Sequence, residues 1–100
     1  MSKVPVCIRP EYTMYLELFD KYLWFHIDVR KWSSEIKKKC TADFAQVQQL
    51  VSVPLFALIE ETNVKLLKFA ITNHWEKRGQ RQLNNGASAF IYASKRNTGE

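Results

Sequence analysis

The chain has 100 residues, of which 46% are hydrophobic, and a formal net charge of +5 at pH 7. That length suits one small domain with a single core. No run of about twenty apolar residues occurs, and the N-terminal MSKVPVCIRP lacks the apolar segment of a signal peptide, which argues against a membrane partner. We therefore expect a soluble, intracellular protein.

The expected fold class is α+β, with an N-terminal β-hairpin, central helices that include a long amphipathic one, and a short C-terminal strand. Residues 1–100 are expected to form a single domain. Within it, residues 1–10 could form an extended arm, and residues 95–100 a flexible tail.

The first element in chain order lies in YTMYLELFDKYLWFHIDVRKW, residues 12–32, which alternates closely from Tyr22 onward. A β-hairpin turning at Asp20-Lys21 would bring three pairs of apolar side chains onto one face: Leu18 with Leu23, Leu16 with Phe25, and Met14 with Ile27. This coherent register favours the hairpin. Because Asp-Lys lacks the glycine of a favourable turn, and the segment is apolar on all sides, a buried helix stays open as the alternative.

Helical signals follow Trp32. Ser33 or Ser34 is a candidate cap for a short helix, and Thr41 for a second one. Pro54 suits the first turn of a third helix beginning LFALIEE. A fourth, longer amphipathic helix is expected to end at Gly79, and its apolar face carries Val64, Leu67, Ile71 and Trp75.

The last expected element is a strand in ASAFIYAS, where small residues alternate with Phe90 and Tyr92 after a turn at Asn84-Asn85-Gly86. The core is expected to contain apolar residues from the hairpin and the helices: Leu16, Leu18, Leu23, Phe25, Ile27, Phe44, Val47, Leu50, Leu58, Val64, Leu67 and Ile71.

The positive charge is concentrated near the C-terminus. Residues 1–61 hold eight Lys/Arg and eight Asp/Glu, whereas residues 62–100 hold seven Lys/Arg and two Glu. Such an asymmetry is typical of proteins with a polyanionic partner, either phosphates or an acidic protein surface, although solubility alone also explains many basic tails. The segment HWEKRGQRQLNN is interpreted as a solvated helix end whose charges steer a partner.

Catalysis is not expected from this sequence. The two histidines, His26 and His74, belong to no cluster with metal-ligand spacing, and the three glycines form no phosphate-binding loop. The two cysteines, Cys7 and Cys40, are spaced neither as a redox pair nor as a metal site, so we expect them to be reduced and structural. We therefore predict a binding protein without catalytic residues, cofactor or metal.

One segment resembles a DNA-binding pattern. ADFAQVQQLVSVPLFALIEE has the cadence of a helix-turn-helix. Its second helix, however, would present apolar and acidic side chains where a recognition helix needs polar and basic ones. A buried helix pair is the preferred interpretation.

The outer face of the hairpin is the stronger candidate for a binding surface. Its aromatic and cationic side chains are of the types enriched at protein interfaces, and aromatic sheet faces also stack single-stranded bases. The alternative is that helices cover this face. The predicted partner-binding residues are Tyr22, Trp24, His26, Arg30 and Trp32, with Lys77, Arg78, Arg81, Lys95 and Arg96 from the basic C-terminal part.

Two long stretches carry a family resemblance: MSKVPVCIRPEYTMYLELFDKYLWFHIDVRKW and VPLFALIEETNVKLLKFAITNHWEKRG. Through them the whole chain resembles the anti-RecBCD family, small accessory proteins of temperate lambdoid phages. The resemblance implies a non-enzymatic inhibitor that acts in the host cytoplasm and docks on the host exonuclease-helicase RecBCD, with RecC as the expected subunit. Linear phage DNA would be spared and recombination redirected to phage proteins.

The resemblance carries no residue-by-residue roles, because no signature motif supports it. The alternative function is direct nucleic-acid binding, with Tyr22 and Trp24 stacking bases and the C-terminal cations contacting phosphates. In the preferred reading the protein meets DNA only weakly or through the complex. The sequence also leaves open whether a host prolyl isomerase acts on Pro5, Pro10 or Pro54.

Overall fold

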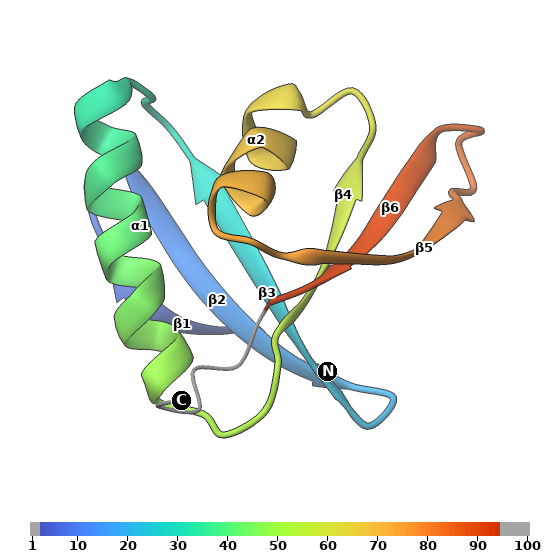
Figure 1. Cartoon of the computed structure of the whole chain (residues 1–100), viewed down its shortest axis with the longest axis horizontal. Coiled ribbons are helices and arrows are strands. Elements are labelled where there is room, and N and C mark those ends of the chain that lie inside the picture. Colours follow the sequence, from blue (N-terminus) through green and yellow to red (C-terminus); the bar gives the residue numbers. More distant parts are fainter. Residues whose placement is uncertain (1–2, 95–100) are drawn as a thin grey trace.

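The computed structural model describes residues 3–94, which form a six-stranded sheet and two helices (Figure 1). The strands lie in the order β1-β2-β3-β4-β6-β5, and all neighbours are antiparallel except the parallel pair β3 and β4. In chain order the elements are β1 (Val4–Ile8), β2 (Tyr12–Phe19), β3 (Tyr22–Val29), α1 (Ser34–Gln49), β4 (Phe56–Glu60), α2 (Val64–Thr72), β5 (Glu76–Gln82) and β6 (Ser88–Ala93).

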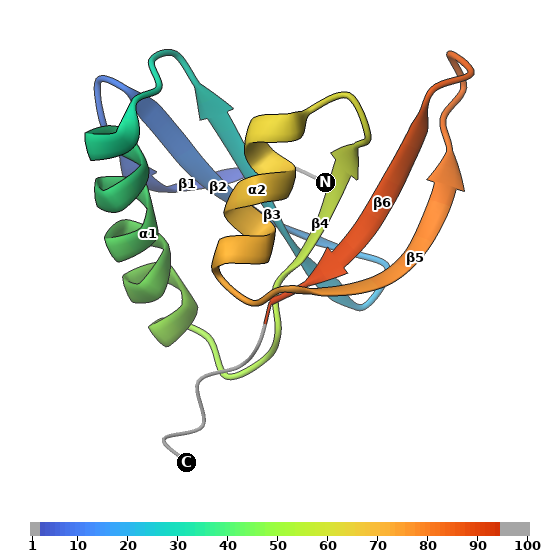
Figure 2. The ribbon, with the colours of Figure 1, turned by 45° about the horizontal axis from the view of Figure 1, so that its top comes forward.

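Both helices pack on the same face of the sheet, as Figures 1 and 2 show. Phe44 of α1 meets Phe25 of β3 at a ring distance of 5.1 Å and Phe69 of α2 at 6.0 Å. The core therefore lies between this inner face and the two helices. The opposite, outer face carries no helix within the described residues. An α+β fold with one open sheet face is the result.

The N-terminal hairpin has the predicted register. Leu18 pairs with Leu23, Leu16 with Phe25, and Met14 with Ile27. The two turn residues, Asp20 and Lys21, have φ angles of 52° and 73°. Two successive left-handed residues match the right-handed twist of the flanking strands, so the turn forms without glycine. The buried-helix alternative for this segment is wrong.

Residues 33–49 form one helix, not the two that were predicted. Ser33 is the N-cap, and its Oγ accepts a hydrogen bond from the Ile36 N–H at 3.1 Å. Thr41 does not begin a second helix, because its hydroxyl instead donates to the Lys37 carbonyl oxygen one turn earlier at 2.9 Å. With the hydroxyl satisfied inside the helix, nothing interrupts α1 at this point.

The third predicted helix is a strand, which also overturns the buried helix pair. β4 alternates, with Ala57 and Ile59 facing the core and Phe56 and Leu58 facing outward. Before the strand, the Leu55 N–H donates to the Ser94 Oγ at 2.8 Å. Pairing with β6 over its whole length outweighs the helical propensity of LFALIEE.

The fourth predicted helix ends earlier than expected. α2 begins after its N-cap Asn63 and stops at Thr72, since His74 adopts a left-handed φ of 62°. Gly79 is therefore no helix stop; it lies inside β5, the edge strand that pairs with β6. The interpretation of HWEKRGQRQLNN as a solvated helix end is wrong. The strand in ASAFIYAS is confirmed as β6.

The predicted core is partly correct. Leu16, Phe25, Phe44 and Val47 are buried, and Leu23, Ile27 and Leu67 pack partly buried against them. Five other predicted core residues are exposed, because they lie at the hairpin tip, at helix ends, on the solvent side of α2 or on the outer sheet face: Leu18, Leu50, Leu58, Val64 and Ile71.

The chain termini give two further observations. Val4–Ile8, within the segment proposed as an extended arm, forms the edge strand β1 and pairs with β2. The flexible tail proposed for residues 95–100 lies outside the described residues. Neither α1 nor α2 has the length and apolarity to span a bilayer.

Candidate functional site

The outer sheet face carries a cluster of large apolar side chains, called here the aromatic surface. Phe19 and Tyr22 come from the two sides of the hairpin tip and are about half exposed, at 56% and 49%. The pairing of β2, β3 and β4 places further rings beside them on the same face. The surface consists of Phe19, Tyr22, Trp24, Phe56 and Leu58.

The aromatic surface is held in place by contacts among its own members. The Phe56 ring lies 4.8 Å from that of Tyr22 and 5.8 Å from that of Trp24. The Trp24 Nε1–H donates to the carbonyl oxygen of Phe19 at 3.2 Å, which fixes the indole across the hairpin. Rings that are already ordered lose little conformational entropy on binding, so the surface is preorganised for a partner.

Charged side chains on this face are mostly acidic. The acidic residues that face outward from β2, β3 and β4 are Glu17, Asp28 and Glu60, and the Arg30 guanidinium lies 3.4 Å from Asp28 Oδ2. His26 Nε2 lies 2.8 Å from Glu17 Oε1, so these two side chains are in contact within the face. Carboxylates border the aromatic surface, two of them with a basic side chain in contact, and this arrangement favours an apolar partner with basic residues over phosphates.

Two further predicted binding residues, Arg30 and Trp32, follow the end of β3. Arg30 donates to the carbonyl oxygens of Arg9 at 2.6 Å and Pro10 at 3.0 Å, and to the Thr13 Oγ1 at 2.8 Å. Its guanidinium therefore fastens the loop between β1 and β2. Trp32 is half-buried on the helix side of the sheet, where it packs against the core. Of the five hairpin residues predicted, Tyr22, Trp24 and His26 share the outer face, Arg30 contacts Asp28 and Thr13 at the end of that face, and only Trp32 lies on the helix side.

The predicted basic residues do not gather beside the aromatic surface. Lys77 places its Nζ 4.1 Å from the centre of the Phe90 ring, and Arg78 Nε lies 3.2 Å from Glu76 Oε1. Arg81 is exposed on β5, three strands from Trp24, so the two backbones are at least about 14 Å apart at typical strand spacing. Lys95 and Arg96 lie outside the described residues.

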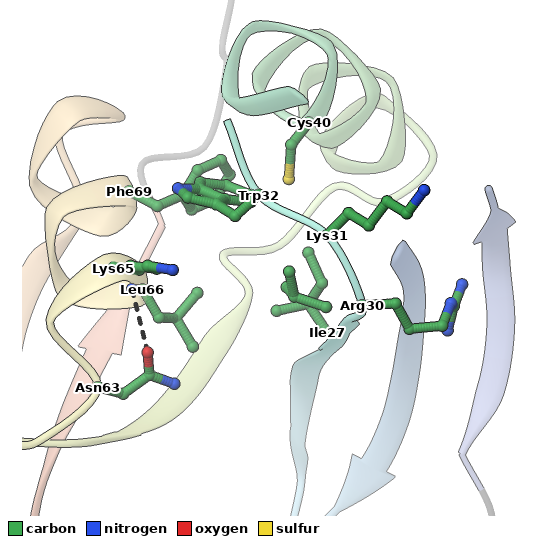
Figure 3. A pocket seen from close by; sticks show the side chains of 10 residues that line it. Ile27, Arg30, Lys31, Trp32, Cys40, Asn63, Lys65, Leu66 and Phe69 are labelled. Carbon is green, nitrogen blue, oxygen red and sulfur yellow. Dashed lines mark hydrogen bonds between the residues drawn. The ribbon is translucent and has the colours of Figure 1, made fainter. Parts of the chain in front are cut away.

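A separate pocket of about 330 Å³ lies on the helix side, where β3 ends and α2 begins (Figure 3). Trp32 and Phe69 lie next to each other at one end, and Leu66 faces Ile27 across the space. None of the residues that line the pocket, all within the described part of the chain, is a carboxylate.

The groups that could do covalent or metal chemistry are otherwise engaged. Burial raises the pKa of Cys40 to about 12, and burial together with the neighbouring Asp43 raises the pKa of Cys7. Both thiols are therefore protonated and poorly nucleophilic at neutral pH. In the described part of the chain no three His, Cys, Asp or Glu side chains converge into a metal site.

Sequence reasoning missed Phe19, Phe56 and Leu58 of the aromatic surface, and the last two lie on β4. The usable signal was the alternation in Phe56–Glu60, in which every second residue faces outward. That alternation was hard to recognise because the apolar run LFALI, residues 55–59, is equally compatible with the start of a helix.

Comparison of the chain with family models, curated proteins and solved structures finds no match.

Proposed function

We propose that this protein is a non-enzymatic binding protein that docks on another protein through its aromatic surface. The observation that carries the proposal is an ordered cluster of rings on a sheet face that neither helix covers. Tyr and Trp anchors of this kind supply much of the binding energy at protein interfaces. The half-exposed Phe19 and Tyr22 leave apolar area for a partner to bury.

The electrostatics of the same face favour a protein partner over nucleic acid. A protein that binds single strands combines stacking rings with cations that follow the backbone. Here the acidic residues Glu17, Asp28 and Glu60 lie on β2, β3 and β4, and Arg30, which lies 3.4 Å from Asp28, is held by further hydrogen bonds within the protein. Direct nucleic-acid binding remains the alternative, and it would have to use the cations of β5 without the rings.

The proposed target is the host RecBCD enzyme, with RecC as the subunit contacted. Support comes from the resemblance of the chain to phage anti-RecBCD proteins. Of the two stretches that carry the resemblance, one contains Phe19, Tyr22 and Trp24 and the other contains Phe56 and Leu58, so together they supply the whole aromatic surface. In this proposal the protein acts in the host cytoplasm. It protects linear phage DNA because RecBCD with the protein bound no longer degrades that DNA.

The test is a titration of purified protein into RecBCD that is degrading linear duplex DNA. Inhibition should saturate near one protein per enzyme and reverse on dilution, because a protein without catalytic groups acts only while bound. Inhibition at far lower ratios would contradict the mechanism. The absence of any effect, with no complex detected by size-exclusion chromatography, would exclude RecBCD as the target.

A salt series separates protein docking from nucleic-acid binding. A phosphate binder that used three cations of β5 would lose affinity for duplex DNA with a log-log salt slope of about −3. The proposed protein should bind isolated DNA weakly or not at all. Tight binding to naked single-stranded or double-stranded DNA at physiological salt would favour the alternative function.

A further inference from the structure

The pocket between β3 and α2 has a structural origin in the sheet. The parallel strands β3 and β4 pair at Trp24 and Phe56, and no further Cα pair joins them within the described residues. Beyond this point they diverge, and the pocket opens near the ends where the strands feed into α1 and α2 (Figures 1 and 3). In open sheets, ligands bind in the crevice at the carboxyl ends of parallel strands.

The polar part of the pocket consists of donors. Lys65 and Asn63 face the space between α2 and β3, whereas Arg30 and Lys31 are turned away (Figure 3). The Oδ1 of Asn63 caps α2 by accepting from the Leu66 N–H at 3.3 Å, which leaves the amide Nδ2 as a donor toward the pocket. A group bound here would therefore meet an ammonium and an amide donor.

The start of α2 adds a positive potential to these donors. Lys65 lies in the first turn of the helix, and that turn contains no acidic residue. The N-terminus of a helix carries a partial positive charge, so a lysine in this turn opposes the helix dipole instead of compensating it. An anion bound beside Lys65 and Asn63 would neutralise the Lys65 ammonium and the partial positive charge of the helix N-terminus.

The rest of the pocket is apolar and partly aromatic. Trp32 and Phe69 form one end, and Ile27 and Leu66 form opposite walls. Phe69 is almost completely buried, whereas Trp32 is half-buried and so offers ring surface to a ligand. A volume of about 330 Å³ lies within the range of small-molecule sites.

We propose that this pocket binds a small organic phosphate in which a phosphate group is joined to a planar apolar group. The phosphate contacts Lys65 and the Asn63 amide at the start of α2, and the planar group lies against Trp32. The site is on the opposite side of the sheet from the aromatic surface, so this inference does not depend on the proposed function.

The test uses 1-naphthyl phosphate as the probe, with 1-naphthol and inorganic phosphate as its two halves. Binding is followed by two-dimensional amide and indole NMR of the full chain. We expect 1-naphthyl phosphate to bind at least about tenfold more tightly than either half, because it alone uses both the donors and the rings. The shifted signals should be those of Trp32, Asn63 and Lys65.

Two matched variants locate the phosphate. Lys65→Gln should weaken 1-naphthyl phosphate about tenfold and leave 1-naphthol unchanged. Lys68→Gln, an exposed lysine of the same helix that does not line the pocket, should change neither. Thermal unfolding of both variants checks that the fold is retained.

Three outcomes would overturn the proposal: equal affinity for 1-naphthol and 1-naphthyl phosphate, equal effects of the two lysine variants, or shifts centred on Trp24 of the outer face. No binding of 1-naphthyl phosphate at millimolar concentration would also overturn it.

Discussion

Trp24 of β3 and Phe56 of β4 form the Cα pair at which the two parallel strands meet, and their rings lie 5.8 Å apart on the outer face. The same two residues therefore join the N-terminal strands to the C-terminal strands and form the centre of the aromatic surface. A substitution at either position should therefore act on stability and, if the proposed function holds, on binding. The two effects have to be measured separately.

Replacing Trp24 by alanine should weaken the complex with the protein partner by about 2 kcal/mol, or roughly 30-fold, if the indole is an interface anchor. Ile71→Ala is the matched control, because Ile71 is an exposed apolar residue on α2, away from the aromatic surface. The measurement is the concentration of protein that half-inhibits RecBCD, with urea unfolding of each variant in parallel. A folded Trp24→Ala protein with unchanged inhibition would show that the aromatic surface is not the interface.

Part of this fold could be read from the sequence because the relevant interactions are local. The register of the hairpin follows from matching Leu16 with Phe25 and Met14 with Ile27, and the paired strands adopt it. The strict alternation around Trp24 also placed Tyr22, Trp24 and His26 on one face. Both inferences needed only residues that are close in the chain.

The secondary-structure predictions were wrong where contacts between distant segments of the chain determine the structure. β4 is a strand because it lies between β3 and β6, and its partner residues, such as Phe90, are about thirty positions away in the chain. The same holds for β5, whose polar sequence gives no strand signal but pairs with β6. The pocket could not have been predicted, because it depends on the divergence of β3 and β4 and so on tertiary geometry.

Acid should destabilise the protein through Asp43. The two hydrogen bonds from Arg9, each 2.9 Å, lower the pKa of Asp43 from 3.8 to about 2, and the hydroxyl of Tyr12 donates a further bond at 2.5 Å. Because the folded pKa lies below the unfolded one, this stabilisation is present above about pH 4 and is lost as pH falls toward 2. The loss should amount to about 1 to 2 kcal/mol, allowing for solvent screening by the exposed side of Arg9.

Urea unfolding at a series of pH values measures that loss. Asp43→Asn removes the titrating group, so its stability should change less with pH between about pH 5 and pH 2 than that of the parent. Asp28→Asn, at an exposed residue of β3, is the control and should keep the parental pH dependence. If Asp43→Asn and the parent showed the same slope, other carboxylates would be responsible.

A buried chain of hydrogen bonds closes one end of the fold and should be sensitive to Ser94. The Leu55 N–H donates to the Ser94 Oγ, Ser94 donates in turn to the Gln48 Oε1, and the Gln48 Nε2 donates to the Val53 carbonyl oxygen. Ser94→Ala would leave a buried donor and a buried acceptor unpaired, which should cost about 1 to 3 kcal/mol. Ser88→Ala, at a half-buried serine at the opposite end of β6, should cost less, and equal losses would argue against the network.

Trp75 should tolerate the loss of its N–H but not of its ring. The side chain is 7% exposed and packs against Phe25 and Phe44 at ring distances of 5.9 and 5.0 Å, yet its Nε1 has no hydrogen-bond acceptor among the described residues. Trp75→Phe removes a buried unpaired donor, which should stabilise the folded state by about 1 kcal/mol. It also leaves a small cavity, which should destabilise the folded state by about 1 kcal/mol. Its stability in urea should therefore stay within about 1 kcal/mol of the parent, whereas Trp75→Ala should lose about 3 to 5 kcal/mol. A loss with Trp75→Phe that approached that of the alanine variant would mean that the indole N–H is satisfied and contributes to the core.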